Sequence, residues 1–143
     1  MATYISANAT DLLSVRDVIE PTAAASTFTT GWLDAGTACQ WMAVISAGTV
    51  GTSADAKIEQ ATSVGGAGAK DLTGAAITQL TAAGSALIEF KPADLDTAND
   101  FTHIRLSITT VGATTVASGH LLSIGHRHEP QAQGSDIDEE VTV

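Results

Sequence analysis

Aromatic residues are scarce in this chain, and so are cysteine, proline and basic residues. Only 4% of its 143 residues are Phe, Trp or Tyr, so Ile, Leu and Val must supply most of a core, and few rings can stack on a sugar. The single cysteine, Cys39, excludes an intramolecular disulfide. Because it begins an apolar run that reaches Ile45, we expect it to be a small core residue rather than a nucleophile.

The shortage of basic residues also excludes classes of partner. The chain has 16 acidic residues and 6 basic ones, which gives a formal net charge of −10. A nucleic-acid binder needs a basic surface to neutralise phosphates, and an anionic membrane likewise attracts basic segments. We therefore expect no nucleic-acid partner and no membrane partner. The chain also lacks a secretory signal pattern and an apolar run of roughly 20 residues, so synthesis in a reducing cytoplasm is expected.

Two segments alternate between apolar and polar residues, at positions 86–90 and 102–108. A period of two with one apolar face is typical of a half-buried antiparallel strand. His103 and Arg105 lie on the polar face of the second segment. The residues that we expect to face a common core are Ala86, Ile88, Phe90, Thr102, Ile104, Leu106 and Ile108.

Further short strands are predicted at intervals of about ten residues, with turn residues between them. The pattern in the first of them, with Leu12, Val15 and Ile19, also fits a helix, but β-branched residues and the Pro21 stop favour a strand. The apolar run 39–47 is expected to be a central strand covered on both faces. The predicted fold is therefore all-β, a single-domain antiparallel β-sandwich or jelly roll over residues 11–125. The additional strands are Asp11–Glu20, Thr27–Asp34, Cys39–Ala47, Asp55–Ala61 and Thr115–Gly125, with a short element in Asp71–Leu80.

The two ends of the chain differ from this domain. Residues 1–10 are small and polar, with Tyr4 and Ile5 as isolated apolar positions, and we interpret them as a flexible N-terminal arm. Residues 126–143 form an acidic C-terminal tail of low hydrophobicity, which cannot bury enough surface to fold alone. Both ends are expected to be mobile in the free protein, and at least one is expected to become ordered on a partner.

Candidate metal ligands are few. His126 and His128 stand two residues apart, so on a strand both rings would face the same side and could bind one zinc ion. A third ligand, such as His120 or His103, would have to come from elsewhere in the fold. A polar strand end gives the same spacing without metal, and we favour that interpretation.

Other motifs with possible chemistry are also incomplete. The Gly-rich loop 62–70 lacks the GK[ST] ending and the βαβ context of a phosphate site. The aspartates between Asp94 and Asp100 lack the glycine and the terminal glutamate of a calcium loop, and turns explain them better. No G-x-S-x-G motif is present, and no catalytic triad can be assembled from spacing. We expect no enzymatic activity, no cofactor and no metal.

Several short motifs resemble a family of small proteins encoded among the head genes of tailed bacteriophages. Related prophages and gene-transfer-agent-like particles carry similar proteins. The resemblance extends from Asp17 to Ile124, and the arm and tail lie outside it. The segments that carry it are Asp55–Thr62 (DAKIEQAT), Lys70–Gly74 (KDLTG), Ile77–Thr81 (ITQLT), Asp94–Asp96 (DLD) and Phe101–Ser107 (FTHIRLS).

This resemblance implies a capsid cement or decoration protein on the outer surface of an icosahedral virion, made in the bacterial host cytoplasm. The implied partners are the major capsid protein and other copies of this chain, as a homotrimer in preference to a dimer. The competing interpretations are a tail-tube or head–tail connector component, and a carbohydrate-binding β-sandwich displayed on the particle. The candidate interface residues are Tyr4, Ile5, His103, Arg105, His126 and His128.

Overall fold

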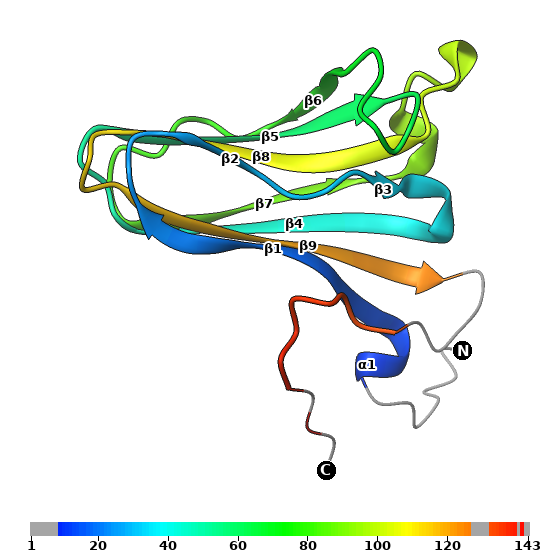
Figure 1. Cartoon of the computed structure of the whole chain (residues 1–143), viewed down its shortest axis with the longest axis horizontal. Helices are drawn as coiled ribbons and strands as arrows, with labels where there is room; N and C mark the ends of the chain where they lie inside the picture. Colours follow the sequence, from blue (N-terminus) through cyan, green and yellow to red (C-terminus); the bar gives the residue numbers. More distant parts are fainter. Residues whose placement is uncertain (1–8, 127–131, 140, 142–143) are drawn as a thin grey trace, which may run out of the picture.

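The chain folds into two antiparallel sheets packed face to face (Figure 1). This computed structural model describes residues 9–126, 132–139 and 141. Sheet A contains, in spatial order, β1 (Leu13–Ala23), β9 (Val116–His126), β4 (Ala38–Thr49) and β7 (Gly84–Phe90). Sheet B contains β2 (Thr27–Thr29) and β3 (Leu33–Asp34), both paired with β8 (His103–Val111), followed by β5 (Ser53–Ala61) and β6 (Lys70–Ala76).

The order of the strands identifies a jelly roll. If β2 and β3 count as one interrupted strand, the first strand pairs with the last, the second with the second last, and so on inward. The four resulting pairs are β1–β9, β2/β3–β8, β4–β7 and β5–β6. A long hairpin rolled up in this way is the jelly-roll topology. The predicted all-β sandwich or jelly roll is therefore confirmed.

The core lies between the two sheets and is built mainly from aliphatic side chains. Ile104, Leu106, Ile88 and Phe90 all belong to it, which confirms the faces predicted from their alternation. Trp41 is fully buried, and its indole Nε1 donates a hydrogen bond to the Ala35 carbonyl oxygen at 2.9 Å. A buried indole therefore keeps its polar group satisfied.

The predicted strand 27–34 is divided in two. The Thr30 backbone and side chain both bond to Leu106, and the Gly31 N–H donates to the Asp17 carboxylate at 2.7 Å. These contacts replace regular ladder bonds over residues 30–32, so β2 and β3 are separate short strands.

Two expectations for β4 were wrong. Cys39 is exposed, because it lies at the second position of β4, near the end of the sandwich, rather than among its central residues. Only one face of β4 is covered by the other sheet. Met42 and Val44, which point outward, are only half-buried among the described residues.

The C-terminal region also differs from the expectation. His126 is the last residue of β9, not the start of a tail, because β9 pairs with β4 as far as Ala38. Residues 132–139 are not free of the domain, since their N-terminal part is hydrogen-bonded to the open edge of β1. Figure 1 shows this segment together with the short helix α1 (Ala9–Leu12), next to the start of β1 and away from sheet B.

Candidate interaction surface

Three of the six candidate interface residues lie within the described part of the chain, and the structure places His126 apart from His103 and Arg105. Tyr4, Ile5 and His128 lie outside the described residues. His126 is only 8% exposed, and its Nε2 lies 2.6 Å from the Ser123 hydroxyl, so its ring packs inside the domain rather than on its surface. His103 and Arg105 lie on β8, on the outer face of sheet B.

Arg105 belongs to an ionic network on that outer face. Its Nε donates to Glu59 Oε2 at 2.6 Å, and Lys57 lies 3.5 Å from the other oxygen of Glu59. Lys57 also contacts Asp71 at 2.6 Å, and this hydrogen bond raises the Lys57 pKa above its ordinary value. The network links side chains of β8, β5 and β6. Each of these charges therefore has a partner within the chain.

Trp32 is covered on this face. The Arg105 guanidinium lies 4.5 Å from the centre of its ring. A Cβ added at Gly66 would lie 2.5 Å from the indole Nε1, which shows how closely the Gly-rich loop approaches the ring. The sequence pattern did not reveal this cluster, because it joins three segments that are far apart along the chain.

Four of the five motifs that carry the family resemblance meet at one end of sheet B, whereas Ile77–Thr81 bonds to Ala54 and Ala56 near the other end of β5. Lys70 forms a 2.5 Å ion pair with Asp96, and its ammonium lies 4.2 Å from the centre of the Phe101 ring. The Lys70 hydrogen bond, followed by that of Asn99, holds the Asp96 pKa below its ordinary value. The Asp96 N–H also donates to Gln60 Oε1 at 2.8 Å. These motif residues join the start of β6 and the end of β5 to the segment between β7 and β8, so their role in the fold is structural.

The outer face of sheet A has a different character, because two of its rows are mainly apolar, whereas the next row consists of Ser118, Ser46 and Ser85. Strand pairing places its outward side chains in rows across β1, β9, β4 and β7. One row contains Val15, Leu122, Met42 and Glu89, and the next contains Val18, His120, Val44 and Leu87. Leu87 is 64% exposed. An antiparallel sheet that faces water usually presents polar residues there, so this face is a candidate contact surface.

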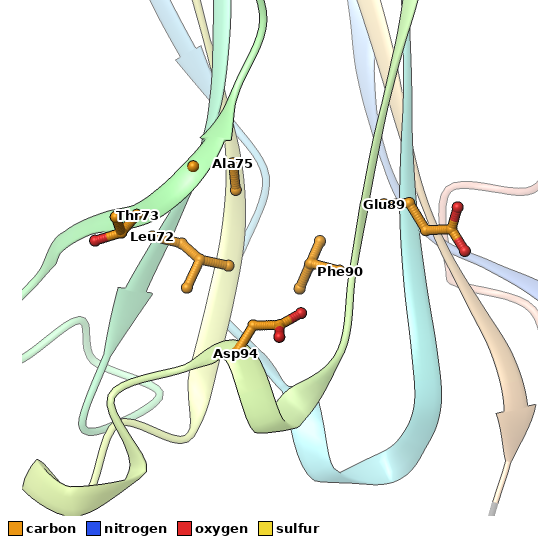
Figure 2. Close-up of a pocket in the computed structure, with 7 residues that line it drawn as sticks. Leu72, Thr73, Ala75, Glu89, Phe90 and Asp94 are labelled. Atoms are coloured by element: carbon orange, nitrogen blue, oxygen red, sulfur yellow. The ribbon is translucent and has the colours of Figure 1, made fainter.

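A cleft of 340 Å³ lies between β6 and β7, where both sheets end. In Figure 2, Leu72, Phe90 and Asp94 point into this space, whereas the Glu89 side chain points away. Asp94 Oδ2 accepts a hydrogen bond from the Lys91 N–H at 2.8 Å, so this carboxylate closes a local turn. No basic side chain and no nucleophile with a neighbouring base lines the cleft.

The described part of the chain contains no group of three or more His, Cys, Asp or Glu residues that could hold a metal ion. It also contains no helix long and apolar enough to cross a membrane.

No protein-family description matches this chain, and no curated protein is similar to it. Among solved structures, the chain resembles that of Broad bean stain virus, with a TM-score of 0.46, 9% identity, and coverage of 97% of this chain and 99% of that one. The comparison with the Tobacco streak virus coat protein gives a TM-score of 0.41 and 7% identity, and it covers 92% of this chain and 95% of that one.

The CBM22-1–GH10 modules of a Clostridium thermocellum endo-1,4-β-D-xylanase, solved with xylohexaose, give a TM-score of 0.42 and 12% identity. The match covers 85% of this chain but only 26% of the xylanase chain. Likenesses this distant concern the fold alone.

Proposed function

We propose that this protein is a structural component of a virion, a capsid cement or decoration protein without enzymatic activity. In this proposal it binds the outer surface of the capsid and joins neighbouring major capsid proteins. The observation that carries the proposal is the pair of mainly apolar rows on the outer face of sheet A, in a chain of net charge −10. An isolated acidic monomer has no need of such a face, whereas a protein that docks on a protein shell does. The resemblance of several sequence motifs to phage head proteins supports the same role.

Docking on a repeated lattice suits a small domain. Each copy buries only a modest apolar area, but a copy that contacts two capsid subunits, or that associates with its own kind, gains from multivalency. The ionic outer face of sheet B, with its charges already paired, would then face solvent. The N-terminal arm, with Tyr4 and Ile5, would extend the contact to a neighbouring subunit.

The carbohydrate-binding alternative finds less support. Sugar binding relies on exposed aromatic rings, and the rings of the described residues are occupied. Trp41 and Phe90 are buried in the core, and Phe28 packs against it. Phe101 lies beneath Lys70, and Arg105 covers Trp32. A tail-tube or head–tail connector role remains the second candidate, and copy number separates it from a cement.

The test uses particles of the encoding virus that lack this protein. Added protein should bind at on the order of hundreds of copies per particle and raise the temperature at which the heads rupture. Saturation at a handful of copies would instead indicate a connector, and no binding to heads would overturn the proposal.

A variant pair tests the surface. Met42→Lys places a charge on the apolar outer face of sheet A, opposite Glu89, so folding should be little affected. Thr109→Lys places the same charge on the outer face of sheet B. Only Met42→Lys should weaken binding to heads, and equal affinities would show that sheet A is not the contact face.

A further inference from the structure

Three of the four edges of the sandwich are protected against pairing with another chain. The β1 edge has two irregularities and Pro21, and it is covered by residues 132–134. Both edges of sheet B are also protected. At one edge, β2 and β3 are only three and two residues long. At the other edge, the pairing of β6 with β5 is interrupted by a register shift between Lys57 and Glu59. Short strands, bulges, proline and covering segments are the usual means of blocking an edge.

The fourth edge, β7, has none of these devices. It pairs with β4 over seven consecutive residues without a register shift, from Gly84 to Phe90. No hydrogen bond of the described residues satisfies the backbone groups on its open side. A cleft separates the Phe90 end of β7 from β6, and Leu87 on the outer face of β7 is 64% exposed.

The sequence of β7 is complementary to itself when two copies run antiparallel around Leu87. In that register Ile88 and Phe90 each lie opposite a small residue, and Leu87 lies opposite its own copy. The cross-strand pairs would be Leu87–Leu87, Ala86–Ile88, Ser85–Glu89 and Gly84–Phe90. No like charges are then directly opposite, which matters because such pairs are destabilising. The two Glu89 carboxylates would lie about 13 Å apart, beyond the Debye length at physiological salt.

We propose that β7 is a self-pairing edge, through which two copies form a dimer with one continuous sheet across a two-fold axis at Leu87. The backbone bonds satisfy the open edge, and the Leu87 side chains bury one another. This favours a dimer over the trimer that the family resemblance implies. The proposal does not rest on the virion role, because it concerns the free protein.

The first test is the solution mass of the full chain by sedimentation at increasing concentration. The wild type should dimerise, and Leu87→Lys should raise the dimer Kd about tenfold or more, since it places two like charges opposite each other. Val64→Lys is the matched control, because Val64 is 70% exposed on a distant loop. A wild type that stays monomeric up to about 1 mM, or equal effects of both variants, would overturn the proposal.

A charge-swap experiment separates pairing at Leu87 from general solubility effects. Leu87→Lys and Leu87→Glu should each be mainly monomeric alone, and an equimolar mixture should form a heterodimer with opposite charges across the axis. Failure of the mixture to associate, while each variant remains folded by circular dichroism, would contradict the two-fold register.

The register itself is tested by cysteine cross-linking in a Cys39→Ala background. Ser85→Cys should not cross-link with itself, but it should cross-link with Glu89→Cys, because these positions face each other only in the proposed register. Dimerisation that persists with efficient Ser85→Cys self-cross-linking would show a different interface.

Discussion

At the scale of single residues, the interior of the sandwich depends on close contact between small and large side chains. A Cβ added at Gly119 on β9 would lie 2.6 Å from Leu106 Cδ2 and 2.8 Å from Ile108 Cδ1, both on the opposite sheet. Gly119 therefore lets the two sheets approach each other at the centre. Leu106 and Ile108 are fully buried, and their packing fills the space that glycine leaves.

Leu106→Ala should lower the free energy of unfolding by about 2–5 kcal/mol, because it removes buried methyl groups and leaves a cavity. Denaturant unfolding followed by circular dichroism measures this loss. Val64→Ala is the control, since Val64 is 70% exposed and lies outside the proposed dimer contact, and it should cost far less. A loss below about half a kcal/mol for Leu106→Ala would mean that its face is not the core face.

The fold around Asp17 changes the ionisation of this residue. Burial raises its pKa above the ordinary 3.8, the Asp136 carboxyl raises it further by a hydrogen bond and by repulsion, and the Gly31 and Val18 N–H groups oppose the shift. The folded state therefore holds this proton at pH values where the unfolded chain has released it. The Asp17 contribution to stability is present at low pH and is lost as the pH rises through the raised pKa.

Asp136→Asn should reduce this pH dependence, because an amide can donate a hydrogen bond to the Asp17 carboxylate and carries no charge. The variant should lose less stability than the wild type between about pH 4 and pH 7. Unfolding curves across that range measure the difference. Asp138→Asn is the control, because it removes an exposed acid from the same segment, and its free energy of unfolding should change with pH as in the wild type. The same pH dependence in all three proteins would exclude the Asp17–Asp136 interaction.

At the scale of elements, the main feature is that a C-terminal segment seals the edge of β1. The Gly134 N–H donates to the Val15 carbonyl at 2.6 Å, and Gln133 Oε1 accepts from the Val15 N–H, also at 2.6 Å. The Ser14 hydroxyl donates to the Ala132 carbonyl at 2.8 Å. These bonds satisfy backbone groups that an open edge would expose, so an acidic segment that cannot fold alone becomes ordered against a strand.

Gly134→Ala should release this segment, because the new Cβ would lie 2.3 Å from the Arg16 carbonyl oxygen. Hydrogen exchange should then accelerate at residues 132–139 and at the Val15 amide, while β4 and β9 remain protected. Gly48→Ala is the control, since a Cβ there meets nothing within 4 Å. Unchanged protection in Gly134→Ala would show that the segment does not depend on this close approach.

At the scale of the whole molecule, the two outer faces have different properties. Sheet B carries a network of paired charges, whereas sheet A carries rows of apolar side chains that end at an open edge. The core residues of the described chain run from Ile19 to Leu121. This arrangement suits a stable domain whose contacts with partners lie at its periphery.

Deletion of residues 1–8 should therefore change the free energy of unfolding by less than about 0.5 kcal/mol, yet weaken binding to heads. The expected cause is the loss of Tyr4 and Ile5, which would bind a neighbouring capsid subunit. Binding to heads is compared with that of Tyr4→Ala/Ile5→Ala in the full chain, which should lose a similar affinity. Full affinity of the truncated protein would rule out a role for the arm.

The sequence alone determined the features that depend on neighbouring residues. Alternation placed Ile104 and Leu106 in the core together with Ile88 and Phe90, and it predicted the all-β class. Several strand boundaries were close because turn residues act locally, but β1 continues through the predicted stop at Pro21 to Ala23, and the predicted strand 27–34 is divided in two.

Tertiary structure alone decided the features that depend on residues far apart in the chain. The exposure of Cys39, the burial of His126 and the docking of residues 132–134 on β1 all follow from which strand ends meet. The covering of Trp32 by Arg105 joins two segments in the same way. Periodicity reports the face of a strand but not its neighbours or the end of the sheet, so only the rolled topology could show which edge remains open.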